Sequence, residues 1–291
     1  MIRDGRVAVN GGVARASHRL RAGDRVAVEL PPPRVSRLAP EDIPLAIVFE
    51  DQHLIVVDKP AGMVVHPGAG VGSGTLVHAL LHHAPGIAGV GGEGRPGIVH
   101  RLDKMTSGLL VAARSPEAYR ALVELLHARA VRRTYRALVW GDPRGDAGAI
   151  EAPVGRDPRD RKRMAVVARG GKPALTRWRV AERFGPVTLL EVTLETGRTH
   201  QIRVHLAHRK LPVVGDPVYG GRGKKLLSAR EPERSLHAAL LGCLPRQALH
   251  AAELDFAHPV SGAALHFASP LPPDFTRALD LLRSFAAKRR H

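Results

Sequence analysis

The sequence predicts an α+β fold with a mixed, mostly antiparallel sheet flanked by helices and loops. Segments with strand patterning cluster along the chain, without the regular strand–helix alternation that builds a parallel sheet. The length of 291 residues suits one large domain, or a large domain with a small one. With 44% hydrophobic and 24% charged residues, the composition is that of an ordinary globular protein with a buried core.

The first 33 residues are predicted to form a small unit. Residues 7–9 and 26–28 have the pattern of short strands, and Asn10-Gly11 is a strong tight-turn signal. The run Pro31-Pro32-Pro33 cannot continue a strand ladder and begins a break in the pattern. We therefore expect a linker over residues 34–45 and the main domain over residues 46–291.

The main domain is predicted from hydrophobic spacing and from start and stop signals. Ser115-Pro116 supplies an N-cap and a first-turn proline for a helix whose apolar side chains recur at helical spacing from Tyr119 to Leu126. A glycine-rich loop covers 68–74, and a hairpin over 248–267 turns at 259–262. The remaining predicted strands are 46–49, 54–57, 108–113, 133–140, 174–180 and 187–194, and the remaining helices are 75–83, 199–208 and 272–290.

Charge is the unusual property of this composition. Lys and Arg number 44 and Asp and Glu 27, which gives a formal net charge of +17. Arginine abundance in an Ala- and Gly-rich chain also follows from GC-rich codon usage, but that bias does not remove acidic residues. The surplus predicts a polyanionic partner, most often nucleic acid or an anionic membrane surface.

Several classes of protein are excluded by composition. The single cysteine, Cys243, rules out a disulfide framework and a cysteine-based zinc site, and fits a reducing cytoplasm. No apolar run approaches the ~18 residues of a membrane span, and the first residues lack a signal-peptide core. With 4% aromatic residues, a broad base-stacking platform is not expected. These features predict a cytoplasmic protein that does not enter a membrane.

Cofactor motifs are weak. Gly89, Gly91 and Gly94 match a dinucleotide-binding pattern, but no strand precedes them and Arg95-Pro96-Gly97 cannot open a helix. The loop at 68–75 lacks the Gly-Lys-Ser/Thr ending of a phosphate loop. The 16 histidines include pairs at helical spacing, but none stands in a helical zinc signature. We expect no nucleotide cofactor, no other cofactor and no metal.

Two polar segments carry the chemistry. In the segment from Gly97 to Gly108, Asp103 lies among basic residues and hydroxyls, which suits an ionised carboxylate acting as a nucleophile; a cap or turn former is the alternative. In the segment from Thr196 to His205, Thr199 is expected to cap a helix, with Arg198 and Arg203 directed at a phosphate or a buried carboxylate. A solvated basic helix is the alternative for this second segment.

These residues resemble the RluA family of pseudouridine synthases. The first signature is His100-Arg101-Leu102-Asp103 with Thr106-Ser107-Gly108. The other matching segments, in the family's order, are Asp58–Gly62 with Val65-His66-Pro67, Tyr135–Val139, Thr196–His205 with Gly215–Gly220, and Leu249-His250-Ala251 with His258-Pro259. The match runs from about residue 43 to 269 and is most similar to the RluD-type branch, which modifies large-subunit ribosomal RNA.

The resemblance implies the pseudouridine synthase fold and an isomerisation of uridine in RNA that needs no cofactor. Asp103 would be the essential carboxylate, either as nucleophile or as base at the sugar, and Arg203 would pair with it. Tyr135 would lie against the uracil ring; a core aromatic on a strand is its alternative. Arg101 would fill the space left by the flipped-out nucleotide. The resemblance assigns RNA-phosphate or active-site contacts to Arg198, His200 and Gln201.

The amino-terminal unit resembles half of an S4-type RNA-binding domain. In that module two helices precede a segment such as Gly5–Gly11, and residues 1–33 correspond to the strand half. Either the start codon has been placed too late or the unit is truncated.

The predicted function is pseudouridine formation in 23S ribosomal RNA by a monomer. A synthase for another ribosomal site or for transfer RNA is one alternative, and a non-catalytic RNA-binding protein of ribosome assembly is another. The basic segment 221–234 is expected to be a loop that could touch RNA or remain solvated.

Overall fold

The computed structural model describes residues 2, 5–29, 38–68, 70–92, 94–223 and 231–289. The chain forms two compact units, Met1–Ser36 and Arg37–His291. Of the linker predicted over 34–45, residues 34–37 lie outside the described residues, whereas Leu38 and Leu45 pack against the core of the larger unit.

The smaller unit contains the two strands predicted for it. Strands β1 (Val7–Val9), β2 (Gly12–Val13) and β3 (Val26–Val28) form a sheet in the order β2-β1-β3. The turn between β1 and β2 has positive φ at Asn10 (50°) and Gly11 (84°), which is the conformation that the Asn-Gly pair favours.

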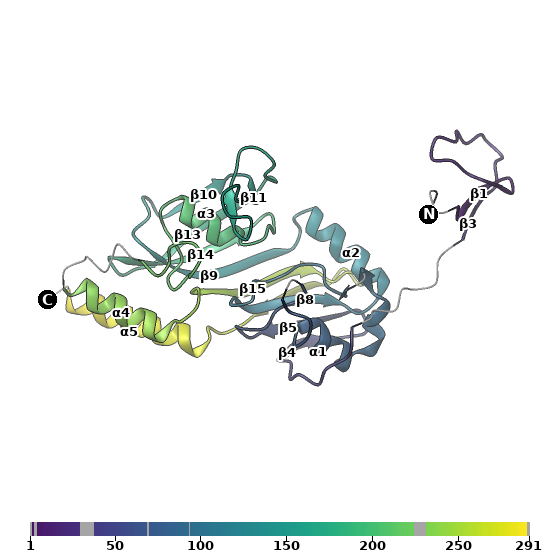
Figure 1. The fold of residues 1–291 in the computed structure, drawn as a ribbon. Coiled ribbons are helices and arrows are strands. Elements are labelled where there is room, and N and C mark those ends of the chain that lie inside the picture. Colours follow the sequence, from purple (N-terminus) through teal and green to yellow (C-terminus); the bar gives the residue numbers. More distant parts are fainter. Residues whose placement is uncertain are drawn as a thin grey trace. The chain divides into compact units, whose positions relative to one another are not determined.

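The larger unit is built on one long sheet, whose strand order is β10-β13-β14-β9-β15-β8-β5-β4, with β16 paired to β15 (Figure 1). All neighbours are antiparallel except β8 and β15. This arrangement confirms the predicted α+β class. The strands are β4 (Ile47–Glu50), β5 (Leu54–Lys59), β8 (Ser107–Ala113), β9 (Arg132–Trp140), β10 (Ala147–Glu151), β13 (Leu175–Arg183), β14 (Val187–Leu194), β15 (Leu249–Ala257) and β16 (Ala264–Ala268).

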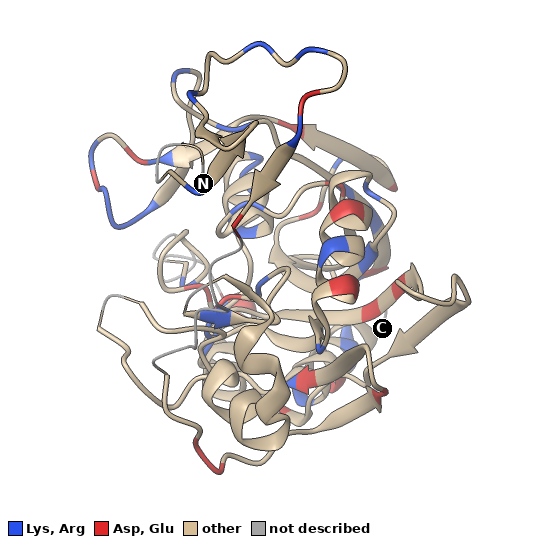
Figure 2. Ribbon diagram, turned by 90° about the vertical axis from the view of Figure 1, so that its right-hand side faces the viewer, with Lys and Arg blue, Asp and Glu red and all other residues tan. Residues whose placement is uncertain are grey.

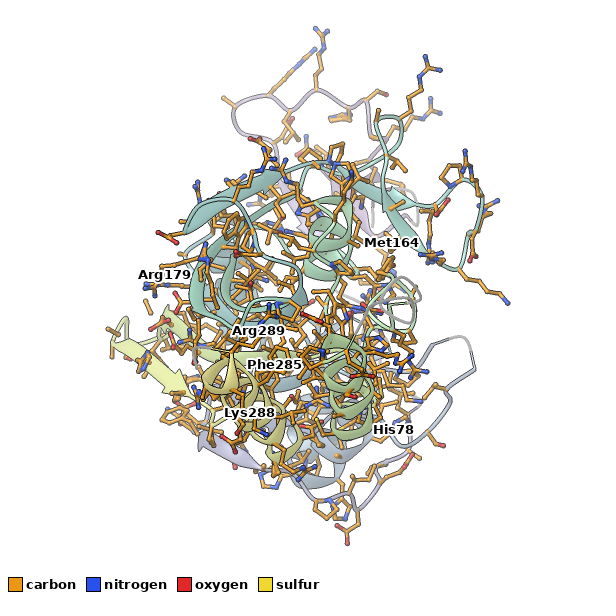
Figure 3. The ribbon with its side chains drawn as sticks, turned by 90° about the vertical axis from the view of Figure 1, so that its left-hand side faces the viewer. His78, Met164, Arg179, Phe285, Lys288 and Arg289 are labelled. Carbon is orange, nitrogen blue, oxygen red and sulfur yellow. The ribbon has the colours of Figure 1, made fainter. Side chains whose placement is uncertain are left out.

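The helices lie against this sheet and at its end (Figure 1). Helix α1 (Leu76–His83) begins after Thr75, and α2 (Pro116–His127) has the predicted Ser115 cap, whose Oγ accepts from Ala118 N–H. Helix α3 (Gln201–His208) is short, and α4 (Glu233–Cys243) packs beside α5 (Pro273–Lys288). Near the end of α5, the Arg289 guanidinium lies 5.6 Å from the centre of the Phe285 ring (Figure 3).

Some elements were not predicted. Part of the segment 221–234 opens helix α4 at Glu233, so the loop prediction is wrong there, and residues 224–230 lie outside the described residues. Residues 154–166 form the small hairpin β11 (Val154–Arg156) and β12 (Met164–Val166). A 3₁₀ turn (Pro85–Gly89) and the two-residue strands β6 (Gly91–Gly92) and β7 (Arg95–Pro96) precede the Asp103 segment.

The core is continuous across the sheet. Strand β8 is buried along its whole length, and β5 is buried except at Asp58. A smaller apolar cluster, made of Val154, Ala174, Val204 and Tyr219, joins the β11–β12 hairpin to helix α3. This cluster fixes the helix that carries Arg203.

Among the helices of the described residues, we find no candidate for a membrane span, because none combines the required length with sufficient hydrophobicity.

Gly108 is required where β8 passes β15. Its φ is +109°, and a Cβ at this position would clash with the backbone of Ala251 on the neighbouring strand. Since the clash is with backbone, it cannot be relieved by a rotamer change.

We expect Gly108→Ala to lower the free energy of unfolding by about 3 kcal/mol or more, measured by urea denaturation. Gly242→Ala is the matched control, because Gly242 lies in helix α4 with nothing within 4 Å of its added Cβ. That substitution should be neutral or stabilise by up to about 1 kcal/mol. Equal effects of the two substitutions would contradict this account of Gly108.

Candidate active site

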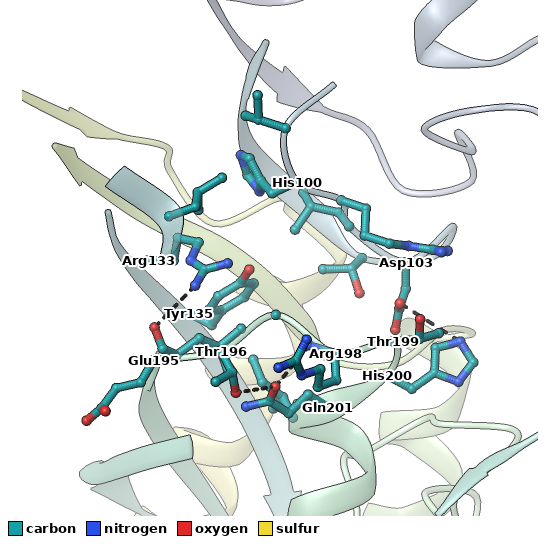
Figure 4. A pocket seen from close by; sticks show the side chains of 18 of the residues that line it. His100, Asp103, Arg133, Tyr135, Glu195, Thr196, Arg198, Thr199, His200 and Gln201 are labelled. Carbon is teal, nitrogen blue, oxygen red and sulfur yellow. Dashed lines mark hydrogen bonds and ion pairs between the residues drawn. The ribbon is translucent and has the colours of Figure 1, made fainter. Parts of the chain in front are cut away.

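A cavity of about 480 Å³ lies where the Asp103 loop, strand β9 and the start of helix α3 meet (Figure 4). This volume is within the range of small-molecule sites. Its wall contains all seven residues predicted for the site: Arg101, Asp103, Tyr135, Arg198, His200, Gln201 and Arg203. The structure thus brings together residues from three distant parts of the sequence.

Asp103 lies in a tight loop just before β8. Its carbonyl accepts a hydrogen bond from Thr106 N–H at 3.0 Å, and its side chain is 14% exposed. One carboxylate oxygen accepts from Arg203 Nη1 at 2.9 Å, and the other lies 3.9 Å from His200 Nε2. The carboxylate therefore faces the cavity with a fixed cation on one side.

Two buried basic side chains hold this loop from behind. Lys59 Nζ donates to the carbonyl of Lys104 at 3.3 Å and to the carbonyls of Pro60 and Met63. Burial lowers the pKa of Lys59 to about 7, although the Asp103 carboxylate acts in the opposite direction. Arg246 Nη1 donates to the carbonyl of Met105 at 3.1 Å. The two residues that follow Asp103 are thereby held in place.

Arg203 is shared by two carboxylates. Its Nε and Nη2 donate to both oxygens of Asp216, at 2.6 and 2.9 Å, while Nη1 reaches Asp103. Burial disfavours the charge of Arg203, but Asp216 and Asp103 outweigh this effect and raise its pKa. Asp216 is fully buried and also accepts from the backbone N–H groups of Val218 and Tyr219. The guanidinium plane is therefore fixed before any substrate arrives.

The start of helix α3 differs from the prediction. His200, not Thr199, is the N-cap residue, with a left-handed φ of 57° and no side-chain cap hydrogen bond. This backbone places the His200 ring between Asp103 and Tyr219, where Nδ1 lies 2.8 Å from the Tyr219 hydroxyl. Burial lowers the pKa of His200, while the negative charge of Asp103 opposes that shift.

Tyr135 forms part of the cavity wall from strand β9. It is only 4% exposed, and burial raises the pKa of its hydroxyl. The positive charge of Arg133 opposes this shift and the negative charge of Asp103 adds to it, so both charges act on this hydroxyl. The ring belongs to the core and also lines the cavity, so the core-aromatic alternative is confirmed, and contact with uracil stays a prediction.

Gln201 and Arg198 line the cavity in different ways. The Gln201 amide oxygen accepts from Arg198 N–H and the Thr196 hydroxyl, and its nitrogen donates to Leu175 O and Thr176 Oγ1. Gln201 is 2% exposed, so this side chain holds the loop before α3. Arg198 Nε donates to the carbonyl of Pro173, and Arg101 is exposed at the cavity.

A profile of the family described as RNA pseudouridylate synthase matches residues 53–208. The chain belongs to this family. It is 49% identical to the "Ribosomal large subunit pseudouridine synthase D" of Xanthomonas campestris pv. campestris, over 99% of this chain and 84% of the relative. Identity to the protein of the same name from Pseudomonas aeruginosa is 47%, over 97% of this chain and 85% of the relative.

Solved structures agree with this family assignment. The human "RNA Pseudouridylate Synthase Domain Containing 4" has a TM-score of 0.62 and 27% identity, covering 82% of this chain and 93% of that chain. The human "RNA Pseudouridylate Synthase Domain Containing 1" has a TM-score of 0.57 and 25% identity, covering 83% and 95%. The resemblance and the synthase fold predicted from the sequence are confirmed.

Sequence reasoning missed four charged residues of this synthase site: Lys59, Arg133, Asp216 and Arg246. Lys59 and Asp216 lie in segments that match the family, but the contacts that tie them to the site, with Lys104 and Arg203, span 45 and 13 positions. The available signal for Lys59 was its place two residues after the apolar run Leu54–Val57, on the same strand. Arg133 stands two residues before Tyr135, so strand alternation places both on one face of β9. Among the described residues, no group of three or more potential His, Cys, Asp or Glu ligands could hold a metal ion.

Buried histidines should make this fold sensitive to acid. Burial, with a smaller effect of Arg133, lowers the pKa of His100 to about 3, compared with about 6.5 when unfolded. Between these values the unfolded chain binds the extra proton, so stability is present above pH 6.5 and is lost as the pH falls.

We expect the unfolding free energy to fall below pH 6.5, with His100 contributing about 1 kcal/mol per pH unit. Urea denaturation of His100→Gln at pH 7.0 and 5.0 should show a smaller pH dependence than the unchanged protein. His208→Gln is the control, because His208 is exposed, and it should change the pH dependence little. An unaltered pH dependence in His100→Gln would refute the assignment.

Proposed function

We propose that this protein converts uridine to pseudouridine in large-subunit ribosomal RNA, with Asp103 as the essential carboxylate. The observation that carries the proposal is the Asp103–Arg203 ion pair on the wall of a cavity whose other side is Tyr135. The names of the two bacterial relatives support the RNA class. Since all these residues come from one chain, we propose that a monomer acts on the RNA in the cytoplasm.

The reaction breaks the C1′–N1 bond of uridine, turns the uracil and joins C5 to C1′. A uridine inside a helix cannot reach Asp103, so the nucleotide must flip into the cavity. There the uracil would lie against Tyr135, and the sugar would face Asp103. Asp103 acts at the sugar either as a nucleophile or as a base, while Arg203 and Asp216 keep its position fixed. Atoms are conserved overall, as an isomerisation requires.

RNA binding is assigned to exposed basic residues. Lys and Arg are spread over strands, helices and loops rather than gathered in one element (Figure 2). We propose that Arg101 and Arg198 contact the RNA near the cavity and that His200 supports the site. We also propose that residues 1–33 act as an S4-like RNA-binding unit. The three-stranded sheet and the basic residues of this unit support that role.

Asp103→Asn should lower the rate of pseudouridine formation by about 10⁴-fold or more, because it removes the charge and keeps the shape. The substrate is ribosomal RNA from cells that lack the gene, and pseudouridine is mapped chemically. RNA affinity, measured by filter binding, should change less than about threefold. Asp42→Asn, an exposed carboxylate, is the control and should keep full activity. An active Asp103→Asn protein would overturn the assigned role.

Arg101→Ala should slow modification most where the target uridine is stacked in a helix. If Arg101 fills the space of the flipped nucleotide, its loss adds an unstacking cost of a few kcal/mol. We expect a reduction of at least about tenfold on a structured RNA and a smaller one on an unstructured RNA of the same sequence. Equal reductions on both RNAs would show that Arg101 only contributes charge.

A further inference from the structure

Arg133 is a buried arginine without an acidic partner. The described residues include three arginines that are more than nine-tenths buried: Arg133, Arg203 and Arg246, at 7%, 4% and 3% exposure. Arg203 is held by both oxygens of Asp216, and Arg246 by both oxygens of Asp274. Arg133 has only one long hydrogen bond, from Nη2 to the carbonyl of Leu194 at 3.5 Å, and its buried Nε has no partner among the described residues.

A guanidinium with one long hydrogen bond and no acidic partner destabilises the fold in this position, because a single carbonyl replaces little of the hydration that burial removes. Such a group is retained where a ligand supplies the missing acceptor. Arg133 lines the same cavity as Asp103 and lies beside Tyr135 (Figure 4). The missing acceptor is therefore expected to enter with the substrate.

His100 is a second donor without an acceptor in this cavity. Its Nε2 accepts from Val111 N–H at 3.1 Å, so the neutral ring carries its proton on Nδ1. That Nδ1 is buried and has no partner among the described residues. Arg133 and His100 thus both present hydrogen-bond donors without acceptors at one cavity, and Arg133 is charged. A ligand with several acceptor atoms and high electron density would satisfy both donors.

The base is the part of a nucleotide that fits this requirement. The phosphates of a flipped nucleotide remain linked to the strand outside the cavity, whereas Arg133 is 93% covered by protein, since its exposure is 7%. Uracil brings two carbonyl oxygens into the cavity. They gain negative charge when the C1′–N1 bond breaks, because the bond's electron pair moves to N1 and is delocalised onto both oxygens.

We propose that Arg133 binds a carbonyl oxygen of the target uracil and stabilises the uracil anion that forms when the glycosidic bond breaks. This inference rests on the proposed function. The anion then turns, C5 bonds to C1′, the C5 proton leaves and N1 gains a proton. Arg133 keeps all its protons throughout and acts through hydrogen bonding and charge.

The first test uses Arg133→Met, with Arg246→Met as a comparison for stability only, because Arg246 is a buried arginine that has an acidic partner. The wild-type protein is first used to map the modified uridine in ribosomal RNA, and a short RNA containing that uridine serves for single-turnover kinetics. Arg133→Met should lower the rate about 10²–10³-fold, the effect of removing one donor to a developing anion, with RNA affinity changed less than twofold. Its melting temperature should stay equal or rise, whereas that of Arg246→Met should fall.

The second test probes the contact itself with RNA that carries 2-thiouridine or 4-thiouridine at the target. Sulfur is a weaker hydrogen-bond acceptor than oxygen. At the position that Arg133 contacts, the sulfur substitution should therefore lower the rate of the wild type by a larger factor than it lowers the rate of Arg133→Met. Comparing these two factors cancels the effect that sulfur itself has on breaking the C1′–N1 bond. If Arg133→Met fails to fold, Gly197→Ala replaces it, because its Cβ would lie 3.0 Å from Arg133 Nη1 and displace the guanidinium. We expect at least about a tenfold lower rate in that variant.

Three results would overturn the inference. They are full activity of Arg133→Met, equal thio effects in the two proteins, and a loss confined to RNA affinity with a weaker salt dependence, which would indicate a phosphate contact. If Gly197→Ala is used instead, a wild-type rate would also overturn it. A wild-type protein that forms no pseudouridine in any RNA would instead refute the proposed function.

Discussion

The site depends on one guanidinium that two carboxylates share. Asp216 binds Arg203 with both oxygens inside the protein, and this leaves Nη1 directed at Asp103. The three residues come from the loop before β8, from helix α3 and from the segment after α3, so the ion-pair chain also joins these parts of the fold. A lysine in place of Arg203 could not bridge the two carboxylates in this way, because its three N–H donors share one nitrogen and cannot form a planar fork. The backbone N–H groups of Val218 and Tyr219 add to the hold on Asp216, which makes the arrangement rigid before RNA binds.

A second constraint acts on the backbone behind Asp103. Lys59 and Arg246 donate to the carbonyls of Lys104 and Met105, so the loop is fixed by buried basic side chains rather than by strand pairing. Gly108 then lets β8 pass close to β15 at the only parallel contact among the described strand pairs. Together these features place an acidic side chain at a cavity while its own backbone is held on the opposite side. A loop without such support would lose the geometry that a reaction at C1′ requires.

Local patterns predicted most elements, because strand alternation, the Ser115 cap and the turn residues act over a few positions. The sequence motifs also brought the seven site residues together. Long-range contacts could not be predicted in this way. Nothing in the residues next to Arg203 indicates that Asp216 is its main partner. The left-handed backbone of His200 makes His200 the N-cap in place of the expected Thr199. The β11–β12 hairpin was missed because its sequence is rich in charged residues and lacks a clear apolar alternation. Helix α4 does carry an apolar signal, with Leu236 and Leu240 buried and four residues apart, but the basic segment before it favoured a loop prediction.

The formal charge of +17 can be interpreted from where the arginine–carboxylate ion pairs lie in the structure. At the surface, Arg136 and Arg179 share Glu191, and Arg129 and Arg177 share Glu195, so each of these carboxylates faces two guanidinium groups. Inside the cavity the balance is uneven. Arg203 has two carboxylates and Arg133 has none, so the cavity wall carries the Asp103 carboxylate at one place and an uncompensated guanidinium at another, and both charges act on Tyr135. Breaking a glycosidic bond separates charge in the same sense, leaving C1′ electron-poor and uracil electron-rich. A field fixed in that direction before the substrate arrives lowers the barrier without reorganisation, at the cost of one buried charge that stays unpaired until the base enters.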